Sequence, residues 1–186
     1  MVLYIFAGPN GSGKSTIISQ YIRLYRLENI EYICPDIYAS KLFDNVKDVK
    51  ERYLKAIRFS EYKREKLLER NQPIIVETVL SRSDKLDFVK KAKSKGYEII
   101  SVFVGTDSPE INISRVKQRV LQGGHDVPED RLRERFVRSM NNLEYLSKLS
   151  DEIYVYDNSL KPRLVASKIK NVEFVAEDAP DWAKKI

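Results

Sequence analysis

The sequence has very little cysteine and histidine, and this scarcity excludes several kinds of site. Cys34 is the single cysteine and His125 the single histidine among 186 residues. One cysteine cannot form an internal disulfide or a cysteine-rich metal site, and a free thiol is typical of the reducing cytosol. We therefore expect a cytoplasmic protein.

Long apolar runs are also missing. No run approaches the ~20 residues that cross a bilayer. The apolar segment 2–7 has no basic start and is too short for the apolar core of a signal peptide. We expect no partner in the membrane.

Charges of both signs are abundant. The chain has 33 Lys and Arg against 27 Asp and Glu, a net charge of +6. This balance favours anionic partners such as nucleotides, sugar phosphates or nucleic acid. With 42% hydrophobic residues, a chain of this length can bury a substantial core, and we expect one domain over 1–186.

Strand-like and helix-like segments alternate along the chain. The predicted strands are 2–7, 31–34, 73–76, 97–104 and 153–156, with a further one at 172–175. Helices are expected at 15–25, 46–70, 84–95, from 107, from 128 and at 162–170, and Ser81 with Asp84 resembles a capping box. Trp182 is expected to pack back onto the body. The alternation predicts an α/β three-layer sandwich with a mostly parallel sheet of five or six strands.

A phosphate-binding motif lies between the first strand and the first helix. It consists of Gly8, Pro9, Asn10, Gly11, Ser12, Gly13, Lys14, Ser15 and Thr16. This run fits G-x-x-x-x-G-K-[ST], the P-loop, in which backbone N–H groups surround the β-phosphate. We expect Lys14 to bridge β- and γ-phosphate oxygens of ATP and the Ser15 hydroxyl to hold Mg²⁺.

Acidic residues at two strand ends favour a small-molecule kinase over other P-loop classes. We find no Asn-Lys-x-Asp motif of a switch GTPase. A large ATPase would need a strand that ends in Asp after four apolar residues, whereas the third strand here ends in Glu77-Thr78 and the second in Cys34-Pro35-Asp36. Asp36 follows the second strand, where a general base for an acceptor hydroxyl is expected, although it also fits a helix N-cap. Glu77 ends the third strand and fits either a contact with the acceptor or Mg²⁺, or a turn cap.

Two arginine stripes flank Gly123 and Gly124. Arg115 and Arg119 are four residues apart on one helix, and Arg131, Arg135 and Arg138 follow on the next. Such stripes fit a solvated face or a phosphoryl-transfer lid, here at about 109–149. We expect at least one arginine, first Arg115 or Arg119, to contact ATP phosphates. The role of His125 stays open between structure and site.

The sequence resembles the zeta toxin family of P-loop kinases from residue 2 to about residue 158, as a small chromosomal-type member. The resemblance depends on the P-loop, Pro35-Asp36, Glu77-Thr78-Val79-Leu80-Ser81, Lys95-Gly96-Tyr97-Glu98, Arg115-Val116 and Gly123-Gly124-His125-Asp126-Val127-Pro128.

This resemblance implies ATP-dependent phosphorylation of a sugar hydroxyl on UDP-N-acetylglucosamine. Asp36 would be the base, Lys14 and Arg115 would stabilise the transferred phosphate, and an antitoxin protein would block the nucleotide site. The substrate-contacting residues would be Asp36, Glu77, Thr78, Ser81 and His125. Toxin members resemble Glu-Gly-Thr where this chain has Glu77-Thr78-Val79. Val79 would then replace a hydroxyl that contacts the sugar, so we expect UDP-N-acetylglucosamine to be a poor substrate.

Two other functions remain open from the sequence. A polynucleotide or nucleoside kinase uses the same motifs, but a basic stripe interleaved with aromatic residues is missing, so nucleic acid is not the expected partner. A nucleotide-dependent binding module without phosphotransfer would use Asp36 only as a cap.

Overall fold

One twisted sheet organises the protein, which the computed structural model describes over residues 1–122 and 126–186. Its strands are β1 (Val2–Ala7), β2 (Glu31–Ile33), β3 (Ile74–Thr78), β4 (Glu98–Gly105), β5 (Glu152–Asp157), β6 (Arg163–Ile169) and β7 (Val172–Val175). The order across the described sheet is β2-β3-β1-β4-β5-β6-β7. The pairs among β2, β3, β1, β4 and β5 are parallel, and β6 and β7 add antiparallel to β5.

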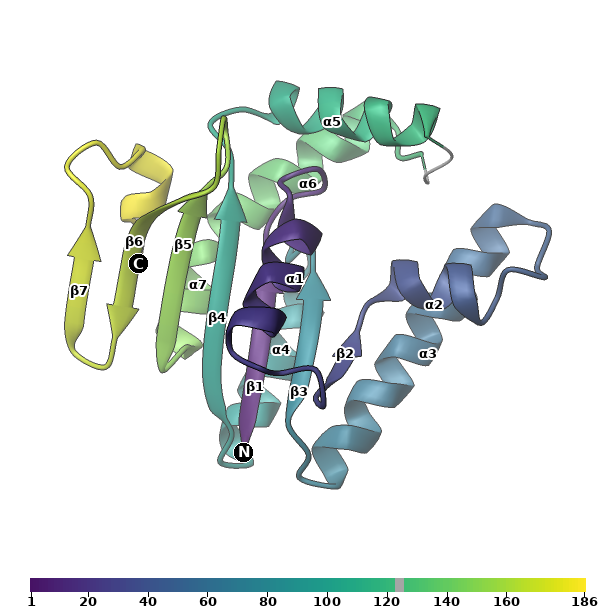
Figure 1. The fold of residues 1–186 in the computed structure, drawn as a ribbon, viewed down its shortest axis with the longest axis horizontal. Helices are drawn as coiled ribbons and strands as arrows, with labels where there is room; N and C mark the ends of the chain where they lie inside the picture. The colour runs from purple at the N-terminus through teal and green to yellow at the C-terminus, as the bar shows by residue number, and fades with distance from the viewer. Residues whose placement is uncertain (123–125) are drawn as a thin grey trace.

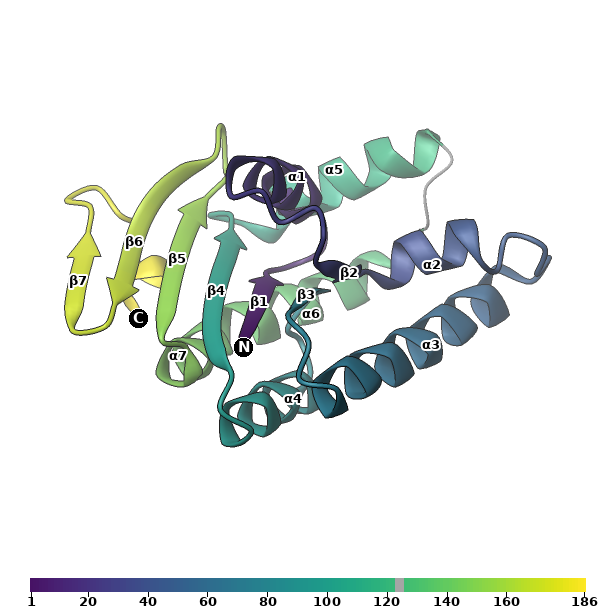
Figure 2. The same cartoon turned by 60° about the horizontal axis from the view of Figure 1, so that its bottom comes forward.

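Helices cover both faces of this sheet (Figure 1). They are α1 (Lys14–Leu24), α2 (Pro35–Lys41), α3 (Val49–Glu69), α4 (Ser83–Ser94), α5 (Pro109–Leu121), α6 (Glu129–Asn141), α7 (Leu143–Leu149) and the 3₁₀ helix η1 (Asp181–Lys184). Figure 2 shows α1 on one side of the sheet and α4 and α7 on the other. No helix in the described part of the chain is long and apolar enough to cross a membrane.

The central strand β1 is buried on both sides, which explains its continuous apolar sequence. Leu3 and Ile5 pack into the cluster that α4 and α7 cover. Phe6 points to the opposite face and packs against Ile17 and Ile18 of α1. The three-layer α/β sandwich is therefore confirmed.

The number of strands was predicted wrongly, because residues 162–170 were expected to be a helix. Residues Arg163–Ile169 instead form β6 and continue through Lys170, at a φ of 56°, into β7. Strand β5 would otherwise end the sheet with unpaired N–H and C=O groups, and β6 satisfies them while burying Val165 and Ala166. Tertiary pairing has overridden the local helical pattern, and the sheet has seven described strands.

Helix starts also differ from the predicted ones. The long helix predicted at 46–70 begins after Asp48, whose carboxylate accepts from the Glu51 N–H at 2.7 Å. Ser81 is not a cap, because α4 begins at Ser83 with Arg82 at its N-cap. The predicted packing of Trp182 is confirmed, with its ring centroid 6.3 Å from that of Phe103.

Candidate nucleotide and acceptor site

The P-loop joins β1 to α1 at the carboxyl edge of the parallel strands, where ligands of open α/β sheets bind. Its glycines are required by geometry. Gly8 has a φ of 143°, and a Cβ there would lie 2.1 Å from the Val104 carbonyl oxygen. Gly13 has a φ of 91° and directly precedes the N-terminus of α1, which favours an anion. The loop conformation thus fits a bound phosphate chain.

Lys14 is held inside this loop. Its ammonium donates to the carbonyl oxygens of Gly8 and Pro9, both at 2.8 Å, and the residue is 6% exposed. Burial lowers the pKa of Lys14, and the carboxylates of Glu77 and Asp36 oppose that shift. A buried cation at the N-terminus of α1 is suited to phosphate oxygens.

Glu77, at the end of β3, is the acceptor of a small hydrogen-bond cluster. It accepts from the hydroxyl of Tyr32, from Ser15 Oγ at 3.3 Å and from the thiol of Cys34 at 3.6 Å. Burial, followed by the charge of Glu77, raises the pKa of Tyr32 above its usual range and that of Cys34 to about 11. Tyr32 and Cys34 therefore stay protonated and donate to the carboxylate.

The same cluster could hold Mg²⁺, since Ser15 Oγ and the Glu77 carboxylate place oxygen donors together beside the P-loop. Oxygen is the ligand that this hard cation prefers, and Mg²⁺ is usually bound by one or two carboxylates together with substrate phosphates. The donor chemistry fits the predicted metal role of Ser15.

A cavity of about 880 Å³ extends from the P-loop between α3 and α6. It brings together most of the predicted site residues at its wall: Asn10, Gly11, Gly13, Lys14, Ser15, Thr16, Asp36, Glu77, Thr78, Ser81, Arg115 and Arg119. Gly8 and Pro9 act instead through Lys14, and Ser12 is fully buried. His125 lies outside the described residues.

Asp36 lies in the first turn of α2, and Cys34 occupies the N-cap of that helix. The interpretation of Asp36 as an N-cap is therefore wrong. Asp36 lines the cavity from this first turn.

The turn after β3 shapes the acceptor side of the cavity. Thr78 Oγ1 accepts from the Leu80 N–H at 3.1 Å, and Leu80 has a φ of 56°. The Thr78 hydroxyl thus stabilises a strained turn, and Val79 lies at the cavity wall beside it.

Cations dominate the far wall of the cavity. Arg131, Arg135 and Arg138 of α6 line it, and burial followed by the charges of the other two lowers the pKa of Arg135. Arg64 of α3 stacks over the Phe88 ring at 4.7 Å, and its buried Nε has no hydrogen-bond partner among the described residues. Such crowding of like charges favours an anionic ligand.

Comparison with known proteins decides the family. The family model described as Zeta toxin matches residues 2–170. The chain belongs to the zeta toxin family. This zeta toxin chain carries its P-loop, residues 8–16, within the matched range.

Three similar proteins illustrate the match. An uncharacterized protein of Haemophilus influenzae is 25% identical over 135 residues, which are 70% of this chain and 89% of that protein. The structure of AvrRxo1-ORF1:-ORF2 with ATP matches at a TM-score of 0.76 and 19% identity, covering 94% of this chain and 60% of that one. The PezAT toxin–antitoxin structure of Streptococcus pneumoniae matches at a TM-score of 0.67 and 20% identity, covering 89% of this chain and 71% of that one. The fold is shared, and this zeta toxin chain spans about 60% of the AvrRxo1-ORF1:-ORF2 chain.

Sequence reasoning missed several residues that contact the predicted ones. Tyr32 contacts Glu77 from β2, and Arg64 and Lys85 line the cavity from α3 and α4. None of the three belongs to a motif. Tyr32 lies in a predicted strand, and a buried tyrosine hydroxyl usually has a hydrogen-bond partner. That was the one signal in the sequence that Tyr32 contacts a polar residue.

Proposed function

We propose that this protein transfers the γ-phosphate of ATP to a hydroxyl group of a small anionic acceptor. The observation that carries the proposal is the single cavity that joins the P-loop to the strand-end carboxylates of Asp36 and Glu77. Nucleotide phosphates at the P-loop would leave the rest of that cavity to an acceptor. The proposed lid, approximately 109–149, spans α5, α6 and α7. Five arginines of α5 and α6 line the cavity: Arg115, Arg119, Arg131, Arg135 and Arg138.

In the proposed transfer each of these residues has one role. Asp36 accepts the proton of the acceptor hydroxyl while the oxygen of that hydroxyl bonds to the γ-phosphorus. The bond from that phosphorus to the β–γ bridging oxygen breaks, and ADP leaves. Lys14, Arg115 and Arg119 neutralise charge on the transferred group. Mg²⁺, held by Ser15 and Glu77, would supply further charge neutralisation when bound.

An anionic acceptor is supported by the cationic wall of the cavity. Arg64, Arg131 and Arg135 lie beyond the P-loop, and a phosphate or diphosphate on the acceptor would pair with them. Lys85 and Arg138 of the same wall are paired with Glu61 and Glu134. A nucleotide sugar such as UDP-N-acetylglucosamine has this chemistry. Its sugar would lie against Glu77, Thr78 and Ser81, with His125 as a further contact.

An antitoxin is the proposed protein partner, and the cytoplasm the proposed location. The similar structures named above are a toxin–antitoxin system and a complex of two chains. A small protein covering the nucleotide site would prevent phosphotransfer until it is removed.

The test is transfer from γ-labelled ATP to a panel of nucleotide sugars, nucleosides and oligonucleotides. Asp36→Asn is expected to lower the rate about 10²–10⁴-fold with unchanged ATP affinity, because it removes the base and leaves the phosphate site intact. The exposed Asp44→Asn, at the end of the α2 region, is the matched control and should retain full rate.

Three results would contradict the proposal. Full transfer by Asp36→Asn would remove Asp36 from catalysis. Phosphorylation of oligonucleotides or nucleosides alone would make the protein a kinase of those acceptors. ATP hydrolysis that no acceptor accelerates would make it a nucleotide-dependent binding module.

A further inference from the structure

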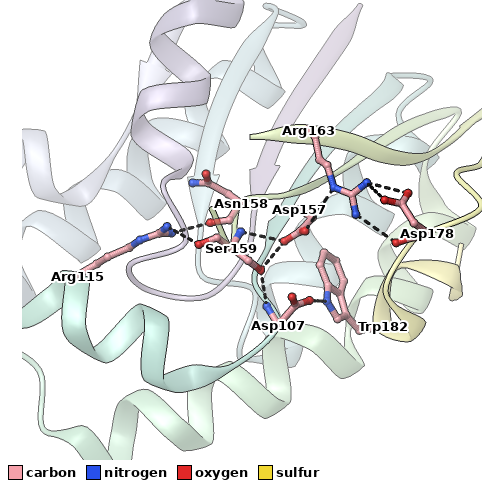
Figure 3. Close-up of polar contacts among 8 residues, drawn as sticks. All are labelled: Asp107, Arg115, Asp157, Asn158, Ser159, Arg163, Asp178 and Trp182. Atoms are coloured by element: carbon pink, nitrogen blue, oxygen red, sulfur yellow. Dashed lines mark hydrogen bonds and ion pairs between the residues drawn. The ribbon is translucent and has the colours of Figure 1, made fainter. Parts of the chain in front are cut away.

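The turn that follows β5 reaches back to the P-loop through Asn158, and Figure 3 shows how the same turn contacts Arg115. Asn158 is 9% exposed, and its side-chain Nδ2 donates to the carbonyl oxygen of Ser12 at 2.8 Å. Its backbone N–H donates to the Gly105 carbonyl at 2.9 Å. A Cβ on Gly13 would lie 2.3 Å from the same Nδ2 atom. Asn158 therefore fixes how closely the P-loop approaches the end of β5.

The same turn holds Arg115 of α5. Arg115 Nη1 donates to the Asn158 carbonyl at 2.8 Å, and Nη2 donates to the Ser159 carbonyl at 3.1 Å. Two neighbouring acceptors fix the plane of a guanidinium, and a charged donor makes the stronger kind of hydrogen bond. The orientation of Arg115 is thus set by the backbone of this turn.

The carbonyls of the turn are themselves held in place. The Asp157 carboxylate accepts from the Ser159 N–H at 2.9 Å and from its hydroxyl at 2.6 Å. Ser159 Oγ in turn accepts from the Asp107 N–H at 2.9 Å. Arg163 lies 3.7 Å from Asp157 and pairs with Asp178 in the C-terminal segment. These contacts hold the Ser159 side of the turn, and the bond from the Asn158 amide to the Ser12 carbonyl holds the other side.

We propose that Asn158 is a positioning residue that holds Arg115 in register with the P-loop. The proposal rests on the proposed function, in which Arg115 stabilises the transferred phosphate. Nucleotide phosphates are fixed by the P-loop, so the arginine must keep a fixed distance from that loop. A displacement of 1 Å in such an arrangement can cost about 10²-fold in rate. The Asn158 amide itself contacts only the loop carbonyl and acts through Arg115.

A double-mutant cycle between Asn158→Ala and Arg115→Ala tests this coupling. Asn158→Ala is expected to slow single-turnover phosphotransfer about tenfold while changing ATP affinity less than about threefold. In the Arg115→Ala background the same substitution should have almost no further effect, because no guanidinium remains to be positioned. Effects that multiply in the double variant would overturn the proposal.

Asn142 offers a matched control. Its Nδ2 donates to the Leu80 carbonyl at 2.8 Å, which is the same kind of bond from a side-chain amide to a loop carbonyl. Asn142 lies outside α5, and its bond does not reach the P-loop or the turn after β5. Any effect of Asn142→Ala on phosphotransfer should multiply with that of Arg115→Ala. The same non-additivity at Asn142 would show that the coupling is not specific to the P-loop contact and refute the role of Asn158.

A second measurement needs no catalysis and separates this proposal from the proposed function. The ¹⁵N relaxation of the Arg115 Nε–H, identified by its loss in Arg115→Lys, reports whether the side chain is ordered without nucleotide. We expect order in the unsubstituted protein and motion in Asn158→Ala. Unchanged relaxation would overturn the positioning role whether or not an acceptor is found, and motion without any phosphotransfer would refute only the proposed function.

A milder variant covers the case in which Asn158→Ala does not fold. Asn158→Ser keeps a polar side chain but removes the amide that donates to the Ser12 carbonyl. It should loosen Arg115 in the same relaxation measurement. An Arg115 signal as ordered as in the unsubstituted protein would again refute the proposal.

Discussion

Replacing Lys14 by methionine should abolish tight nucleotide binding while leaving the fold nearly as stable as before. In the folded protein the ammonium makes two hydrogen bonds to backbone carbonyls. Hydrogen bonds to a charged group contribute about 1.5–3 kcal/mol each. Removing an ammonium from water costs several kcal/mol, so gain and cost nearly cancel. We expect the free energy of unfolding of Lys14→Met to lie within about 2 kcal/mol of the unsubstituted value.

Nucleotide affinity should change far more. Truncating one partner of a buried charge pair costs about 2–5 kcal/mol, which corresponds to roughly 30- to 5,000-fold in affinity. The assay pairs urea unfolding with calorimetric titration of an ATP analogue. The exposed Lys50→Met serves as the control and should change neither quantity appreciably.

The pH dependence of stability checks the physical cause. Burial lowers the pKa of Lys14 below its ordinary 10.5, so between the folded and unfolded pKa values the unfolded chain binds more protons. Raising the pH through this window should therefore stabilise the unsubstituted protein relative to Lys14→Met. Tyrosines titrate in both proteins and cancel in the difference.

Two results would refute this reasoning. A loss of more than about 4 kcal/mol in Lys14→Met would mean that the lysine is a structural clamp of the loop, because its bonds would then far exceed its burial cost. A stability difference that stays flat up to pH 10.5 would mean that Lys14 is not desolvated in solution.

Three further substitutions test other parts of the structure. Tyr32→Phe removes a donor to Glu77, worth about 1.5–3 kcal/mol, and should raise the Mg²⁺ concentration for half-maximal kinase activity about tenfold or more; an unchanged requirement would leave Tyr32 with a packing role. Val79→Thr should raise kcat/KM for UDP-N-acetylglucosamine about 5- to 150-fold, since a sugar hydroxyl regains a partner worth roughly 1–3 kcal/mol; no change for any nucleotide sugar would place the sugar elsewhere. Trp182→Ala uncovers Gly105, against which the ring lies, and should lower Tm by about 6 °C or more in thermal unfolding for a loss of about 3 kcal/mol; a shift under about 2 °C would show that η1 contributes little to the core.

Local patterns predicted the parts of the site that are contiguous in the chain. The P-loop motif consists of nine consecutive residues. Its glycines stand where the backbone adopts a positive φ, a conformation that glycine reaches without strain. Asp36 and Glu77 were predicted to follow or end the second and third strands, at the sheet edge where ligands bind, and both line the cavity. Their chemical roles remain proposals.

Contacts between distant segments could not be predicted in this way. Tyr32 and Glu77 are 45 residues apart, and Asn158 and Ser12 are 146 apart, so no local pattern announces either hydrogen bond. The segment 163–169 was predicted to be helical from its local sequence pattern alone. That pattern contains no information about the unpaired edge of β5, with which the segment pairs. Strand pairing supplies backbone hydrogen bonds from another part of the chain, and this gain exceeds a weak local propensity.

The sequence by itself therefore determined the α/β class, the phosphate-binding loop and the family, because each depends on short-range periodicity or on a run of adjacent residues. Tertiary structure alone decided that the sheet ends in an antiparallel hairpin, that Tyr32 donates to Glu77, and that Asn158 joins the P-loop to the turn that holds Arg115. These features depend on which segments the folded sheet brings within hydrogen-bond distance, and that proximity exists only after the strands have paired.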